Sequence, residues 1–116
     1  MTSTSLTEFA RRDETVAAEM RALRLSATYD GSGFGQLDLV RMPVPVPGPT
    51  EVLVRVALCG ICGTDTDACR FRPDGTSTFG GPISLPVVLG HEAAGEVVRT
   101  GALVTRVGPG DLVALE

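Results

Sequence analysis

The sequence of 116 residues predicts a mainly β fold, a sandwich or a barrel, and three features of the chain indicate it. Short stretches of alternating or β-branched apolar residues recur from residue 20 onward. Glycine and proline occur 14 and 8 times, and many of them lie between these stretches as turn formers. No amphipathic helix of ordinary length follows a predicted strand, so a parallel sheet with crossover helices is not expected. A chain of this length forms one domain at most.

The predicted strands, in chain order, are residues 20–27, 37–41, 51–58, 86–89, 93–98 and 111–115. The first of them alternates apolar and polar residues, as a half-buried strand does. The stretch 51–58 is the strongest, because it is β-branched and mostly apolar. We therefore expect residues 51–58 to form a central, buried strand.

The segments between the strands have their own patterns. Prolines at alternate positions in residues 42–49 predict an extended connector outside any strand ladder. The glycines of residues 31–35 lack G-x-G-x-x-G spacing and a following helix, so they indicate a hairpin turn rather than a dinucleotide site. Residues 62–69 predict one or two helical turns, capped by Thr64 or Asp65. The glycines and prolines of residues 70–82 predict a mobile surface loop.

Residues 1–19 differ in composition from the rest of the chain and form a predicted N-terminal extension. Their apolar residues recur roughly at helical spacing, which favours a short helix. A disordered arm is the alternative, because chain termini are often poorly ordered. The remaining residues, 20–116, would then form the single domain.

Composition excludes several classes of function. The formal net charge of −4, with no basic run, argues against nucleic acid or an anionic membrane as a partner. No stretch approaches the roughly 20 apolar residues that a membrane span needs. All ten basic residues are arginine, so the chain has neither a Schiff-base lysine nor a phosphate-loop lysine. Three cysteines without a secretion signal do not suggest a disulfide framework, and a cytoplasmic location is expected.

Cys59 and Cys62 stand at C-x-x-C spacing directly after the strongest predicted strand. The pair could belong to a structural zinc site, but such a site needs four ligands and a second pair is missing. It could be a redox dithiol, but that motif normally opens a helix in a βαβ unit, which is also missing. Alternatively, one cysteine is a catalytic metal ligand and the other is a small core residue.

His91, the single histidine, lies between Gly90 and Glu92 after a short predicted strand. Alone, a histidine is more often structural than a ligand. Cysteine, histidine and glutamate together make a plausible three-ligand zinc set with an open fourth position, as catalytic zinc requires. Asp65 could accept the second imidazole N–H and fix the tautomer of the histidine, or it could simply cap a helix.

Separated motifs in this chain resemble those of zinc-dependent medium-chain alcohol and polyol dehydrogenases, in the order of that family. They are Glu-Val-Leu-Val-Arg-Val at 51–56, Cys-Gly-Thr-Asp at 62–65, Gly-His-Glu-Ala-Ala-Gly at 90–95 and Val-Gly-Pro-Gly-Asp-Leu-Val at 107–113. The resemblance covers residues 20–116. It implies a GroES-like, partly open barrel that is incomplete here: the N-terminal part of a catalytic domain, without the dinucleotide-binding domain.

The resemblance also implies roles for individual residues. Cys62 and His91 would bind the catalytic zinc, and Glu92 would be a third ligand or a nearby carboxylate. Thr64 would hydrogen-bond the substrate hydroxyl and pass on its proton, while Asp65 would orient the imidazole.

The remaining positions fit the family less directly. Asp67 stands where alcohol-oxidising members often carry a histidine of the proton relay, so an ethanol-like relay is not expected. Cys59 lies outside the usual ligand position and is interpreted as structural, and Cys69 has no role in the family pattern. The segment between Cys62 and His91 is longer than usual, which favours a polyhydroxylated substrate.

The implied activity is metal-assisted oxidation of an alcohol, polyol or sugar hydroxyl, with hydride transfer to NAD or NADP. The nucleotide site is not expected within this chain, so we expect the chain alone to be inactive. The complete enzyme would be a homo-oligomer. The alternative is a stand-alone GroES-like module that holds zinc or binds a partner without catalysis.

Overall fold

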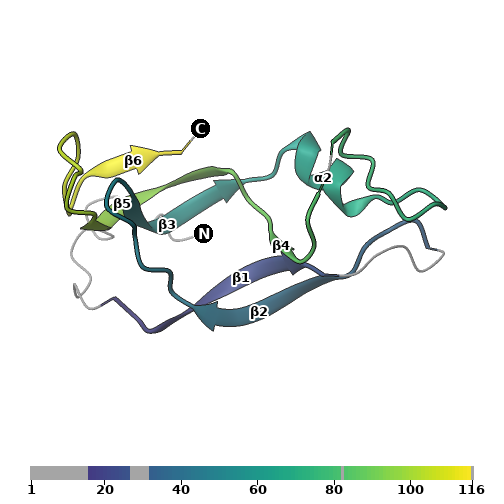
Figure 1. Cartoon of the computed structure of the whole chain (residues 1–116), viewed down its shortest axis with the longest axis horizontal. Coiled ribbons are helices and arrows are strands. Elements are labelled where there is room, and N and C mark those ends of the chain that lie inside the picture. Colours follow the sequence, from purple (N-terminus) through teal and green to yellow (C-terminus); the bar gives the residue numbers. More distant parts are fainter. Residues whose placement is uncertain (1–15, 27–31, 82, 116) are drawn as a thin grey trace, which may run out of the picture.

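The computed structural model describes residues 16–26, 32–81 and 83–115. Its secondary structure is mainly β, as the sequence predicts (Figure 1). The elements, in chain order, are β1 (Glu19–Leu25), β2 (Leu37–Pro43), β3 (Val52–Gly60), α2 (Gly63–Cys69), β4 (Val87–Val88), β5 (Glu92–Thr100) and β6 (Leu112–Ala114). Every predicted strand and the predicted short helix is therefore present, with boundaries shifted by one or two residues.

The strands form two sheets of three strands each, in the orders β2-β1-β4 and β3-β5-β6. All neighbouring strands are antiparallel. Figure 1 shows the two sheets as separate layers, with α2 and the loop that follows it beyond one end of β3. The sheets stay open rather than closing into a barrel, which fits the expectation of an incomplete barrel.

The side-chain alternation of β1 and β5 explains where the core lies. On β5, Ala93, Gly95 and Val97 are buried while their neighbours are less so, which is the period-two pattern of a strand with one covered face. At the end of β1, Leu25 is fully buried. Leu25 packs with Ala68 of α2 and with Phe71 of the following loop in one hydrophobic cluster. This cluster fixes α2 against the first sheet.

The ladder between β3 and β5 determines the position of the candidate site. It runs from Val52 opposite Thr100 to Gly60 opposite Glu92, with two irregularities of register. A side chain at Gly95 would collide with the backbone of Arg55, so the two strands approach closely there. The segment before α2 and the first residue of β5 are therefore held side by side at one end of the second sheet.

The prediction that residues 51–58 form a central, buried strand is wrong. β3 is an edge strand of its sheet. Val56 and Leu58 have exposed fractions of 52% and 74%. The β-branched, apolar composition indicates a strand with apolar faces, but it does not reveal how many neighbours that strand has.

The predicted cap of α2 is also wrong. The N-cap residue is Cys62, and Asp65 is the third helical residue, whose carboxylate accepts a hydrogen bond from the Cys62 backbone N–H at 3.0 Å. Thr64 lies inside the first turn. An aspartate can accept hydrogen bonds from the free backbone N–H groups of a helix N-terminus either as the N-cap residue or as the third helical residue. The sequence alone does not distinguish these two positions.

Two segments between strands differ in part from expectation. Pro43, predicted to lie in a connector outside any ladder, still pairs with Glu19. The loop predicted to be mobile carries two buried residues, Phe71 and Ser77. The hydroxyl of Ser77 donates to the carbonyl of Ala68 at 3.1 Å, and that of Thr78 donates to the carbonyl of Asp67 at 2.9 Å. The loop is thus attached to the end of α2.

The predicted extension falls mostly on residues 1–15, which lie outside the described residues. The described part of the extension is not helical, and its last residue, Glu19, begins β1. The carbonyl of Ala18 accepts a hydrogen bond from the Val44 N–H at 3.0 Å. No helix within the described ranges is long and apolar enough to cross a membrane.

Candidate metal centre

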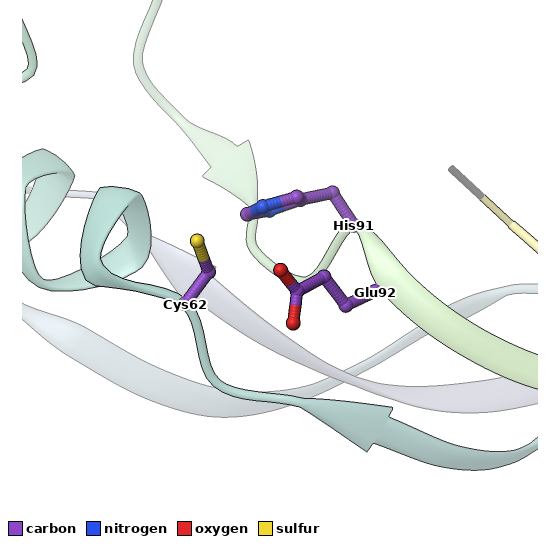
Figure 2. A group of neighbouring side chains, drawn as sticks. All are labelled: Cys62, His91 and Glu92. Carbon is purple, nitrogen blue, oxygen red and sulfur yellow. The ribbon is translucent and has the colours of Figure 1, made fainter.

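Cys62, His91 and Glu92 converge from two segments that are distant in sequence. Cys62 precedes α2, whereas His91 immediately precedes β5 and Glu92 is its first residue. Each offers one ligand atom, and these atoms all lie within 4.8 Å of one another. Figure 2 shows the thiol, the imidazole ring and the carboxylate directed toward a common space. Within the described residues, the structure thus brings together the three side chains that the sequence analysis proposes as ligands.

The backbone around α2 holds the Cys62 thiol at this place. Cys62 has an extended conformation, with φ −103° and ψ 158°, so the chain turns into the helix immediately after it. A hydrogen bond with the Thr64 side chain lowers the pKa of the Cys62 thiol, and hydrogen bonds with the Thr64 backbone and with His91 act in the same direction. A lowered pKa favours the thiolate, which is the form that binds a metal.

The imidazole of His91 is oriented by two residues of α2. Its Nδ1 lies 3.4 Å from Oδ1 of Asp65, and its Nε2 lies 3.3 Å from Oγ1 of Thr64. The pKa of His91 is raised, first by its hydrogen bond with Cys62 and also by the negative charge of Asp65. A carboxylate on one ring nitrogen is the usual partner of a metal-binding histidine, and it leaves the other nitrogen for the metal.

The three donors fit zinc. A thiolate, an imidazole and a carboxylate are its ordinary ligands, and three protein ligands leave a fourth position open for substrate. Zn–S and Zn–N bonds of about 2.3 and 2.0 Å in a tetrahedral site place ligand atoms roughly 3.3–3.7 Å apart. The separations of up to 4.8 Å among these atoms therefore need only small side-chain rotations to close on one ion.

Not every predicted site residue reaches this group. Thr64 and Asp65 contact His91, as stated above, but Asp67 does not: its described contacts are made by its backbone carbonyl, which accepts from Ser77 and Thr78. Cys59 and Cys69 are not part of the ligand cluster found among the described residues. Instead they line an adjacent, mainly apolar cavity of about 420 Å³.

Sequence reasoning missed the residue opposite Glu92. Gly60 ends β3 and pairs with Glu92 in the ladder. The sequence does show a glycine between the strongest predicted strand and the Cys62 motif. That this glycine lies opposite Glu92 follows only from the register of β3 and β5, which cannot be read from the sequence.

Several known proteins are similar in sequence to this chain. The model of the alcohol dehydrogenase GroES-like domain family matches residues 48–116. Sorbitol dehydrogenase of Bos taurus is 44% identical over 84 residues, which are 72% of this chain and 22% of that protein. Sorbitol dehydrogenase of Pongo abelii is 43% identical over 102 residues, which are 87% of this chain and 27% of that protein.

A solved structure is similar as well. It comes from Sinorhizobium meliloti 1021 and is described as a zinc-binding dehydrogenase bound to NADP. It is 33% identical, with a TM-score of 0.55, and the match covers 78% of this chain and 24% of that one. This chain thus spans about a quarter of the length of each of these three proteins. The family model covers more than half of the chain, so the chain belongs to the zinc-dependent medium-chain alcohol and polyol dehydrogenase family and carries part of its GroES-like domain.

Proposed function

We propose that this chain supplies the zinc-binding part of the catalytic domain of an NAD(P)-linked dehydrogenase that oxidises an alcohol, polyol or sugar hydroxyl. The convergence of Cys62, His91 and Glu92 is the observation that carries the proposal. Relatives named sorbitol dehydrogenase favour a polyol among these substrates. The similar structure bound to NADP supports a nicotinamide as the hydride acceptor.

The residues of the site would have different roles in catalysis. Cys62, His91 and Glu92 would hold the zinc, which supplies Lewis acidity that lowers the pKa of a hydroxyl. Asp65 would keep the imidazole of His91 in the tautomer in which Nδ1 carries the proton and Nε2 can bind the metal, because Oδ1 of Asp65 lies 3.4 Å from Nδ1.

Thr64 is placed to move a proton. Its hydroxyl lies 3.3 Å from Nε2 of His91 and therefore borders the space between the ligands. There it would accept the proton of the substrate hydroxyl and release its own proton toward solvent, since Thr64 is exposed. Asp67, which stands at the family's relay position, would act only downstream of Thr64 in proton transfer.

The nicotinamide would be bound outside this chain. The sequence contains no G-x-G-x-x-G motif and no lysine. A hydride donor and acceptor must be held at roughly 3–3.5 Å, so the chain alone should not catalyse hydride transfer.

The second candidate function is a zinc-holding module without catalysis. In that case Cys62, His91 and Glu92 would still bind zinc, and no nucleotide would be needed.

A chimera separates the two functions. The chain would replace the matching part of a sorbitol dehydrogenase relative, and oxidation of polyols with NAD and NADP would be measured. We expect turnover that is abolished by Cys62→Ser and by His91→Ala. A folded, zinc-loaded chimera without turnover would instead support the non-catalytic module.

A further inference from the structure

Gly60 and Glu92 meet at the end of the ladder that carries the metal centre. The two residues are opposite each other in the register of β3 and β5. A Cβ atom placed on Gly60 would lie 3.0 Å from Oε2 of Glu92 and 3.5 Å from its Cβ. The first distance is shorter than about nine in ten real Cβ contacts. A side chain at position 60 would therefore force the carboxylate oxygen to move by a few tenths of an ångström.

This placement matters because Glu92 is otherwise weakly held. It is exposed, and the polar contact described for its carboxylate within the site is a hydrogen bond with the Cys62 thiol. An exposed glutamate normally samples several rotamers in solvent. Figure 2 shows its carboxylate instead turned toward Cys62, across the end of β3.

We propose that Gly60 is a positioning residue for the metal centre. Because it lacks a Cβ, the Glu92 carboxylate can lie over the end of β3, within reach of the Cys62 thiol and the His91 ring. A side chain at position 60 pushes the carboxylate away from this position and weakens its hold on the ion. This inference rests on the zinc site proposed above, and it concerns how the third ligand is held there.

Gly60 offers a cleaner test than the other glycine beside the ligands. Gly90 has φ +107°, and a Cβ there would lie 2.9 Å from Sγ of Cys59. Any substitution at Gly90 therefore strains the backbone, whatever it does to the metal. Gly60 has no positive φ, so alanine fits its backbone conformation. The only close atom that alanine meets is the end of a flexible side chain, so the fold can be kept while the ligand moves.

The experiment is an anaerobic titration of the full chain with Co²⁺, followed by the thiolate charge-transfer band and the visible d–d bands. The variants are Gly60→Ala, Glu92→Ala and the double variant. Gly63→Ala is the matched control, because a Cβ on Gly63 meets nothing within 4 Å. Gly60→Ala should weaken Co²⁺ binding by roughly 10–100-fold and change the d–d bands. The double variant should bind as Glu92→Ala does, and Gly63→Ala should bind as wild type does.

Either of two binding results would overturn the inference. Equal affinities and spectra for wild type and Gly60→Ala would show that the Glu92 carboxylate does not need the space left by the missing Cβ of Gly60. Additive losses in the double variant would show that Gly60 acts through something other than Glu92. If Gly60→Ala alone does not fold, the double variant decides, because it should fold once the crowded carboxylate is gone. A wild-type chain that binds no Co²⁺ would refute the metal site itself, and this inference with it.

Discussion

Oδ1 of Asp65 lies 3.4 Å from Nδ1 of His91, so a residue of α2 orients a side chain at the start of β5. The other oxygen of the same carboxylate accepts the Cys62 backbone N–H at 3.0 Å. One aspartate thus joins the two segments that carry the ligands. Its role as the third residue of the helix and its role beside the imidazole are compatible, since each uses a different oxygen.

Asp65→Asn should weaken zinc binding while the fold is kept. Asparagine has nearly the same shape but no charge, so it still occupies the helix position and no longer favours a protonated Nδ1. Loss of such a partner costs about 10–100-fold in metal affinity. Competition with a chromophoric zinc chelator measures this. Asp67→Asn, in the same helix, is the control and should retain the wild-type affinity, because no described contact joins its carboxylate to the ligands.

The thiols of Cys62 and Cys69 should react at different rates in the metal-free chain. Hydrogen bonding with Thr64 lowers the pKa of Cys62. Burial, and then the charge of Asp65, raises the pKa of Cys69. At a pH below both values, the group with the lower pKa has the larger thiolate fraction and is alkylated faster.

Timed iodoacetamide labelling near pH 8, read by peptide mass spectrometry, checks this order. Cys62 should be labelled before Cys69, and the difference should shrink as the pH rises and both thiols ionise. Thr64→Val should slow the labelling of Cys62, because it removes the side-chain hydrogen bond that lowers its pKa. Labelling of Cys69 at the rate of Cys62 in the folded chain would argue against this electrostatic arrangement.

Phe71→Ala should destabilise the chain far more than Phe79→Ala. Phe71 is 6% exposed and packs in the cluster with Leu25 and Ala68, whereas Phe79 is 44% exposed. Removing a buried phenylalanine side chain costs about 3–5 kcal/mol. Urea unfolding followed by circular dichroism compares the two variants in the same loop. Similar losses for both would mean that Phe71 does not attach the loop to α2 and β1.

The sequence was sufficient to predict most of the elements. Alternation in residues 20–27 indicated β1, because a period of two is a local property of a strand. The glycines of residues 31–35 indicated the hairpin turn between it and the predicted strand at 37–41. Cys62, His91 and Glu92, which the structure brings together, could also be singled out as candidate ligands, since their residue types and their places after strands are local features.

What the sequence did not reveal depends on pairing between distant segments. The edge position of β3 follows from the order of the second sheet, which no local pattern encodes. The importance of Gly60 follows from its register with Glu92. Phe71 and Ser77 are buried because the loop folds back on α2, although its composition is that of a surface loop.

Zinc content tests the metal centre most directly. The purified chain, loaded with zinc and freed of excess metal, would be analysed by elemental mass spectrometry beside Cys62→Ser, His91→Ala and Cys59→Ser. We expect up to one zinc per chain in the wild type and in Cys59→Ser, and strongly reduced zinc in the other two. Equal zinc in all four proteins, or a loss in Cys59→Ser as complete as in Cys62→Ser, would contradict the ligand set of Cys62, His91 and Glu92.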